Sequence, residues 1–311
     1  MKIYINREPV KGPWGGGNKT VTMLINHLQA QGHDVVYTLD TPDLDVLFCF
    51  DPRPNNFGEW YQHLLNYKAA SPQTRIIQRV GDLGTHGKPK LTSLVKQSVK
   101  LSDFLIFPSE WAKEQSEFLG ENGKVIHNAP LSVFHKFKKE SDLKKDKVEL
   151  ITHHWSDNPK KGFEIYKHLD ENIIGDRFGL TYIGRLPSNF KFKNATYISA
   201  TGDNEFLAKR MSNSDIYFTA SEEEAGANHV LEGMASGLPV VYHKNGGSIN
   251  NYCSNYGIGY DSAEDVLEKL ELAIDNFDEL KSDTLKYDNI IENVVSEYAD
   301  IIANCPAIKV G

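Results

Sequence analysis

The segment SEEEAGANHVLEGMASGLPVV, Ser221 to Val241, joins three consecutive acids to a loop of small residues and a short helical pattern. An acid near a helix N-terminus stabilises the helix by roughly 0.3–1 kcal/mol, but one acid suffices for that effect. Glu224 and Glu232 lie eight positions apart, one in the loop and one about a turn into the helix. This spacing can direct both carboxylates toward one ligand, as acceptors of hydrogen bonds from hydroxyl groups.

The loop between these two acids offers backbone donors. DIYFTAS predicts a buried strand, so the loop begins at the carboxyl end of that strand. Asn228 is the predicted N-cap of the helix, which ends at Gly237 and Pro239. We expect the N–H groups of Gly226, Ala227 and Asn228 to lie between the carboxylates, ready for ligand oxygens.

Three glycine or lysine motifs could bind an anion. In HHWSDNPKKGFEIYKHL, Lys161 and Gly162 begin a predicted helix, where an ammonium group lies beside a positive helix end. In KGPWGGGNKTVTML, a glycine run leads into a helix predicted over residues 18–31, and glycines allow close backbone approach. This run is not the spaced GxGxxG fingerprint, and a structural turn explains it about equally well. Gly246 and Gly247 follow a strand at the same predicted sheet edge as Ser221.

The segment RVGDLGTHGKPK places Asp82 and His86 in a glycine-rich loop after a predicted strand. One interpretation is a site for general acid–base chemistry near a reacting hydroxyl. The alternative is an aspartate that caps a turn beside a surface histidine.

Short apolar runs alternate with helical patterns and would hold these motifs. KIYIN, DVVYTL, DVLFCF, RIIQRV, DFLIFP and KVIHN occur in the first half, and VELITHH, LTYIGR, ATYIS, DIYFTA and PVVYH in the second. This alternation predicts α/β domains with parallel sheets covered on both faces. A lysine-rich segment without periodicity, 135–147, predicts the boundary between domains 1–140 and 141–311. A terminal helix over about 288–304 is expected to pack back toward the first domain.

The composition and charge argue against several classes of protein. The chain has 311 residues, 40% hydrophobic and 24% charged, which is typical of a soluble protein of about two domains. A net charge of −8 argues against a nucleic-acid partner. The three cysteines are scattered, which favours reduced thiols and a cytoplasmic location. The N-terminus starts as a strand rather than as a signal peptide, and no run approaches the roughly 18 apolar residues of a membrane helix.

Taken together, these segments resemble family 4 of the retaining glycosyltransferases, which have the GT-B fold. The resemblance covers nearly the whole chain. GGGNKTVTMLINHLQAQGHDV, SDFLIFPSEWAKEQ and VIHNAPLSVF are similar to segments of that family's first domain. EAGANHVLEGMASGLPVV matches its specific signature of two Glu separated by seven residues and followed by Gly-x-Pro. The resemblance implies two Rossmann-like doubly wound domains that face each other across a cleft, with C-terminal helices.

The resemblance also implies a role for each matching residue. Glu224 would hold hydroxyls of the donor sugar near the anomeric carbon, and Glu232 would bind the ribose of the nucleotide. Lys161 would neutralise the diphosphate leaving group, aided by Gly16 and Gly17, because stabilising the charge that develops on a leaving group usually contributes most to such catalysis. Asp82 and His86 would lie on the acceptor side. Further donor contacts are expected from Gly226, Ala227, Asn228 and Arg185.

The chain departs from the family pattern at two places. Where the family has Gly-Arg before Lys-Gly, Trp155 or Ser156 stands here, and Arg185 in YIGRLPSNF is the nearest substitute. The usual Gly-Phe-Gly after the first Glu is Ala-Gly-Ala. Asp43 and Asp45 match the metal-binding DxD of other glycosyltransferases, but no metal is implied in this fold. His153 and His154 point to opposite faces of a strand, so a shared metal is not expected. KPKLTSLVKQSVK could touch a membrane surface, although a solvated lysine face is favoured.

The resulting hypothesis is a metal-independent hexosyltransferase without a cofactor, which uses a UDP- or GDP-sugar and a glycan, glycoconjugate or small-molecule acceptor. Retaining hydrolases use two carboxylates about 5 Å apart, one of them as the nucleophile. The sequence shows no evident carboxylate for that second role, so direct transfer on the same face of the sugar is favoured. The alternatives are a catalytically silent sugar-nucleotide-binding or scaffold protein and a sugar-nucleotide 2-epimerase. A Rossmann dehydrogenase is more distant, because its fingerprint is missing. The sequence does not indicate the base, sugar, acceptor, linkage or oligomeric state.

Overall fold

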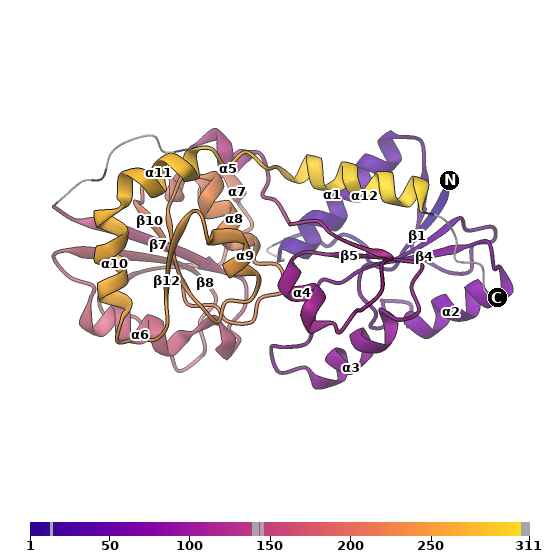
Figure 1. Ribbon diagram of the computed structural model, residues 1–311, viewed down its shortest axis with the longest axis horizontal. Helices are drawn as coiled ribbons and strands as arrows, with labels where there is room; N and C mark the ends of the chain where they lie inside the picture. The colour runs from indigo at the N-terminus through magenta and orange to yellow at the C-terminus, as the bar shows by residue number, and fades with distance from the viewer. Residues whose placement is uncertain (13–14, 139–142, 144–145, 306–311) are drawn as a thin grey trace. The chain divides into compact units, whose positions relative to one another are not determined.

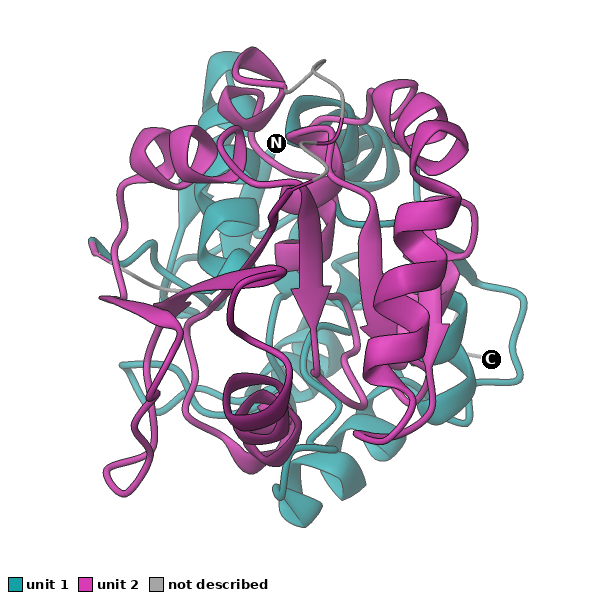
Figure 2. Ribbon diagram, turned by 90° about the vertical axis from the view of Figure 1, so that its left-hand side faces the viewer, with its two compact units in different colours: residues 1–11, 15–128, 291–311 teal, residues 12–14, 129–290 magenta. Residues whose placement is uncertain are grey.

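The computed structural model describes residues 1–12, 15–138, 143 and 146–305. The chain forms two units, which Figure 2 shows in different colours. The first unit comprises residues 1–11, 15–128 and 291–311, and the second comprises residues 12–14 and 129–290. Residues 139–142 and 144–145, within the lysine-rich segment expected as a boundary, lie outside the described residues.

The first unit is built on a six-stranded parallel sheet of order β2-β1-β3-β4-β5-β6. The chain leaves β1 toward one edge and returns to build the other edge from β3 onward. This reversal is a topological switch point, outside which ligands of open α/β sheets usually bind. The strands are β1 (Lys2–Ile5), β2 (Asp34–Val36), β3 (Val46–Cys49), β4 (Arg75–Arg79), β5 (Phe104–Phe107) and β6 (Gly123–Val125).

The C-terminal helix of the chain belongs to the first unit, where it lies beside the first helix (Figure 1). The Tyr298 ring of this helix lies 6.3 Å from the Phe48 ring of β3. A second helix covers the other face, where Tyr61 and Leu64 join a buried cluster with Tyr4. The helices are α1 (Gly16–Ala30), α2 (Tyr61–Ala70), α3 (Pro89–Ser98), α4 (Glu110–Gln115) and α12 (Ile291–Asn304).

The second unit has a parallel sheet of order β12-β11-β10-β7-β8-β9. Renumbered within the unit, this is the 3-2-1-4-5-6 order of dinucleotide-binding folds, read from the other edge, with its switch point between β7 and β10. The strands are β7 (Val148–His154), β8 (Phe178–Gly184), β9 (Thr196–Ser199), β10 (Ile216–Thr219), β11 (Val240–His243) and β12 (Gly257–Tyr260).

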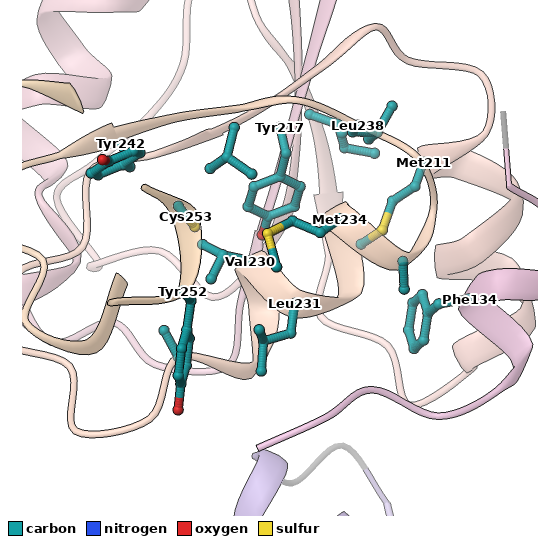
Figure 3. Close-up of a cluster of buried hydrophobic side chains, with 14 of the residues drawn as sticks. Phe134, Met211, Tyr217, Val230, Leu231, Met234, Leu238, Tyr242, Tyr252 and Cys253 are labelled. Atoms are coloured by element: carbon teal, nitrogen blue, oxygen red, sulfur yellow. The ribbon is translucent and has the colours of Figure 1, made fainter. Parts of the chain in front are cut away.

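Helices cover both faces of this second sheet. Along β10, Ile216 and Phe218 pack in one buried cluster, whereas Tyr217 packs in another with Val230 and Met234 (Figure 3). This alternation shows that the strand is buried on both sides. The helical segments are α5 (Val133–Lys136), η1 (Pro159–Lys161), α6 (Phe163–Asn172), α7 (Asn204–Met211), α8 (Asn228–Ala235), α9 (Ser248–Cys253), α10 (Val266–Asp275) and α11 (Phe277–Leu285).

The prediction of two doubly wound α/β units is confirmed, and each of the eleven predicted strands is present. The predicted basic amphipathic helix is α3, which buries Leu91 and Val95. The carboxylate of Asp45 accepts from the backbone N–H of Lys2 at 2.7 Å, so it holds the start of β1. None of the described helices is long and apolar enough to cross a membrane.

Candidate functional site

The loops that follow β7 and β10 meet at the switch point of the second unit. These two strands are hydrogen-bonded neighbours, so their carboxyl ends lie at the same sheet edge. The backbone N–H of Glu222 donates to the carbonyl of Lys160 at 2.8 Å, which joins the two loops directly. The predicted Lys161 and Glu224 are therefore brought together, although they are far apart in sequence.

Local backbone geometry positions Lys161. The side chain of Asn158 caps the short helix η1 by accepting from the N–H of Lys160 at 2.9 Å. Gly162 has a φ of 77°, and a Cβ there would lie 2.2 Å from the carbonyl oxygen of Ala220. Only glycine fits this close, left-handed turn. The turn leaves Lys161 9% exposed at the end of η1.

The three consecutive acids are divided between two lysines. Lys161 forms an ion pair with Glu224, and the side chains are 11% and 14% exposed. Lys160 lies 2.8 Å from Glu223 and 3.2 Å from Glu222, and hydrogen bonding to Glu223 is the main cause that raises its pKa. Glu222 and Glu223 therefore hold the loop after β10 against the loop after β7. Glu224 is the acid that forms an ion pair with Lys161, the lysine predicted to bind an anion.

The glycine pair after β11 supports the Glu224 loop. The N–H of Glu224 donates to the carbonyl of Gly246 at 3.2 Å, and the N–H of Ser248 donates to the carbonyl of Glu224 at 2.8 Å. Gly247, with a φ of 65°, allows this close pairing. The loop after β11 thus lies at the predicted sheet edge and fixes the backbone on both sides of the Glu224 side chain.

The start of α8 differs from the prediction. The cap residue is Ala227 and not Asn228, which is the first helical residue and makes no capping bond. The N–H of Ala227 donates to the Ser248 hydroxyl at 3.0 Å, so it is not left open for a ligand as expected. Among the described residues, Oδ1 of Asn228 and Oγ of Ser221 are buried without a hydrogen-bond partner. Buried polar atoms are nearly always paired, so these two atoms suit a ligand.

Glu232 is held by a histidine that the sequence did not single out as functional. It lies on α8 and is 2% exposed, and its Oε2 is 2.6 Å from Nε2 of His153. An ionised carboxylate only accepts, so the proton is on Nε2. Nδ1 then accepts from the hydroxyl of Tyr217 at 2.9 Å. A Cβ at Gly233 would lie 2.6 Å from the Tyr217 ring, so α8 packs directly on that tyrosine. This packing fixes the orientation of Glu232.

Two other histidines lie in the same cluster and are kept neutral. The rings of His154 and His229 are 4.9 Å apart. Burial, followed by the charge of Lys161, lowers the pKa of His229 to about 3. Burial and the neighbouring His229 also hold the pKa of His154 well below its usual value. Nε2 of His154 is bonded to the hydroxyl of Tyr166 at 2.7 Å, so His153 and His154 serve different partners.

Acid is expected to destabilise the protein through His229. Its pKa is about 3 in the folded chain and about 6.5 when unfolded, so below pH 6.5 the unfolded chain binds a proton that the folded chain does not. The free energy of unfolding should therefore fall between pH 6.5 and 3, and less steeply in His229→Gln. Urea unfolding at pH 7, 6, 5 and 4 measures both slopes. The exposed His63→Gln is the control, and equal slopes in all three proteins would contradict the prediction.

The remaining predicted site residues are Arg185 of the second unit and Gly16, Gly17, Asp82 and His86 of the first unit. Arg185 is exposed directly after β8, and its backbone N–H donates to the carbonyl of His154 at 3.3 Å. Gly16 begins α1, and Gly17 is the second residue of that helix. Asp82 follows β4, where its carboxylate accepts from the N–H of Gly84 at 2.9 Å and so caps a turn.

His86 follows in the same loop as Asp82 and is half-buried. The carboxylate of Asp82 also pairs with Lys88 at 2.8 Å and with Arg53 at 3.3 Å. The turn-capping interpretation of Asp82 therefore has direct contacts in its favour.

The second-unit residues can bind a ligand that carries both phosphates and hydroxyls. Lys161 supplies a cation, Glu224 and Glu232 supply acceptors for hydroxyl groups, and Ser221 and Asn228 supply buried polar atoms without partners. The described residues contain no group of three His, Cys, Asp or Glu side chains arranged to hold a metal ion.

No protein-family model and no curated protein matches the sequence. Solved structures of glycosyltransferases are nevertheless similar along the whole chain. Sucrose-phosphate synthase from Thermosynechococcus elongatus has 13% identity and a TM-score of 0.72, over 97% of this chain and 98% of that one. WaaG, a glycosyltransferase of lipopolysaccharide biosynthesis, has 14% identity and a TM-score of 0.67, over 98% and 100%. Anabaena HepE with UDP-glucose has 12% identity and a TM-score of 0.65, over 96% and 99%. The chain therefore has the GT-B fold of these enzymes.

Proposed function

We propose that the protein is a retaining, metal-independent glycosyltransferase of the family 4 type. It transfers a hexose from a UDP- or GDP-sugar to a hydroxyl of a glycan, glycoconjugate or small molecule in the cytoplasm. The observation that carries this proposal is the Lys161–Glu224 ion pair at the switch point, with Glu232, on the following helix α8, held by His153. Among the similar structures, HepE is bound to UDP-glucose and Arabidopsis starch synthase IV to ADP.

The chemistry follows from the charges of the site. Breaking the bond between the sugar and the diphosphate places negative charge on the leaving oxygens. The ammonium group of Lys161 stabilises that charge as it develops, and a fixed cation in a partly buried site is effective because it needs little reorganisation. The phosphate draws Lys161 away from Glu224. The freed carboxylate of Glu224 then accepts hydrogen bonds from sugar hydroxyls.

The nucleoside is assigned to the neighbouring strand ends. Glu232 accepts from ribose hydroxyls, and His153 keeps the carboxylate in one orientation. A small hollow beside it is lined by His153, Trp155, Ile183 and Leu207, among others. The base is assigned to this side of the site because the half-buried Trp155 ring offers an aromatic face there. Trp155 then takes up part of the place where the family carries its arginine.

The test is calorimetric binding of UDP-, GDP-, ADP- and dTDP-sugars with EDTA present. We expect one donor to bind, and Glu232→Ala to weaken its binding at least tenfold, or about 1.4 kcal/mol, because the ribose contacts are lost. Glu268→Ala, which removes an exposed acid of α10, is the matched control and should bind as the parent does.

Three results would contradict the proposal in different ways. Binding of no donor would remove the nucleotide-sugar site. Donor binding without transfer to any acceptor would favour a silent binding or scaffold protein. Conversion of the donor to its 2-epimer, seen by NMR of the product, would favour an epimerase.

A further inference from the structure

Arg79 is a buried cation in the first unit, and no acid among the described residues neutralises it. It is the last residue of β4 and is 4% exposed. Its Nε donates to the hydroxyl of Tyr298 at 3.2 Å, and its Nη2 donates to Oδ1 of Asn128 at 3.1 Å. Both partners are neutral, and no carboxylate of the described residues forms an ion pair with it. A buried charge without a counter-charge is strongly destabilising in other proteins, so an apolar side chain would serve a purely structural role better than arginine does.

The surroundings hold the guanidinium group but leave one nitrogen unused. The ring of Phe50 lies 4.8 Å from Cζ of Arg79, a cation–π contact that covers one face of the group. Within the described part of the chain, Nη1 donates no hydrogen bond. Gly81 adjoins that nitrogen, since a Cβ there would lie 2.2 Å from Nη1. The guanidinium group is thus held in place while the N–H groups of Nη1 remain available as donors. A planar guanidinium matches the oxygens of phosphate and carboxylate groups.

Arg79 lies at the carboxyl edge of the first sheet, next to its switch point. β3, which precedes Phe50, pairs with both β1 and β4. Asp51 follows Phe50 and is shared by Arg7 at 2.6 Å and Arg53 at 2.5 Å. Burial opposes ionisation of Asp51, but the hydrogen bond from Arg53 and the charge of Arg7 hold its pKa below the usual value. Its negative charge is therefore already taken by two other arginines.

The wider loop cluster at this edge has an excess of positive charge. The cations are Arg7, Arg53, Arg79 and Lys88, and the carboxylates in their contacts are Asp51 and Asp82, which gives four minus two, or a local charge of +2. The whole chain carries a formal charge of −8. A positive cluster at a switch point of a negatively charged protein suits an anionic ligand.

We propose that the first unit binds an anionic group, a phosphate or a carboxylate, on the guanidinium of Arg79. The identification of this group as part of the acceptor rests on the proposed function. The enzyme then glycosylates a sugar phosphate, a uronic acid or another hydroxyl compound of that charge, and a neutral sugar is a poor acceptor. The anion supplies the counter-charge that the described residues do not.

Thermal unfolding of the full chain with inorganic phosphate, at constant ionic strength in chloride, tests the site without any donor. We expect phosphate to raise Tm by about 2–4 °C at saturation. The rise should be absent in Arg79→Met. Arg75→Met, which removes a guanidinium from the other end of β4, is the matched control and should keep it. Lys161→Met should also keep it, which separates this site from the proposed diphosphate site.

Each other result overturns the proposal. An equal rise in Arg79→Met shows an adventitious ion only, and loss of the rise in Lys161→Met places the phosphate in the second unit. No rise in the parent, with a lower Tm in Arg79→Met, makes Arg79 structural. We expect Arg79→Met to fold, because replacing a buried unpaired charge by an apolar side chain is often neutral or stabilising. If it does not fold, Arg79→Lys must bind phosphate at least fivefold more weakly than the parent.

The acceptor assignment is tested separately with glucose 6-phosphate, glucuronate and glucose as ligands. Binding of the phosphate or the uronate, lost in Arg79→Met, supports an anionic acceptor and shows which anion is preferred. Equal binding of glucose overturns the assignment. Failure of all nucleotide sugars to bind would remove the proposed transferase but would leave Arg79-dependent phosphate binding intact.

Discussion

Glu224→Gln is expected to reduce the transfer rate at saturating donor by roughly 10²–10³-fold, the effect of losing one charge-stabilising contact in an active site. Glutamine keeps the size of the side chain and one acceptor oxygen, but it removes the charge that pairs with Lys161. Donor affinity should change less than tenfold, because the proposed role of Glu224 is mainly to accept from the sugar hydroxyls nearest the breaking bond. Initial rates with the donor found by calorimetry, together with the binding constant of the variant, measure both effects.

Glu223→Gln is the matched control for that experiment. Glu223 is the adjacent residue, its side chain is 37% exposed, and it pairs with Lys160. An exposed pair of this kind is worth about 0–1 kcal/mol, so this variant should keep its rate within about fivefold. If both variants lose activity equally, the acidic loop is needed as a whole and Glu224 has no separate role.

The central strands of both sheets were predictable because they are short apolar runs buried on two faces, as in β3 and β10. β12, with the sequence GIGY, was not predicted, since alternate glycines lower the strand signal. The structure gives the reason for Gly257. A Cβ there would lie 1.9 Å from the carbonyl oxygen of Val240, so β11 and β12 approach too closely for a side chain. A requirement of this kind depends on the neighbouring strand and leaves no local periodicity.

The residues of the candidate site were easier to predict than the pairs that their side chains form. The spacing of Glu224 and Glu232 and the Lys-Gly turn named the groups that the structure brings together at one sheet edge. The pairing of Lys160 with Glu222 and Glu223 could not be predicted, because it depends on which strands are neighbours in the sheet. Three acids in a row therefore overstated the number of carboxylates available to a ligand.

The adjacent histidines show a second limit. Alternation along β7 correctly separated His153 from His154, and this separation argued against a shared metal. It did not reveal that His153 orients Glu232, because its partners lie 64 and 79 positions away in sequence. The N-cap prediction at Asn228 was wrong for a related reason. Ser248, from the loop after β11, binds the N–H of Ala227, so tertiary contacts replace a local cap.

Lys161→Met is expected to lower the transfer rate by about 10³-fold or more, a larger loss than in Glu224→Gln. Methionine keeps an unbranched side chain of similar length but removes the cation proposed to oppose charge on the leaving diphosphate. The variant should also bind the free nucleoside diphosphate more weakly than the parent, whereas binding of the nucleoside should hardly change. Rates and calorimetric titrations with both ligands measure these effects. Lys160→Met is the control and should retain most activity, because Lys160 pairs with Glu222 and Glu223.

A double-mutant cycle separates two ways in which Lys161 could act. Its ammonium group touches Glu224 in the structure, so removing it leaves a partly buried carboxylate without its counter-charge. If Lys161 acts only by holding Glu224, the variant carrying both Lys161→Met and Glu224→Gln should be no slower than the slower single variant. If Lys161 acts on the diphosphate and Glu224 on the sugar, the two losses should approximately multiply in the double variant. We expect multiplication, because in the proposed mechanism the donor separates the pair and each residue then contacts a different part of the substrate.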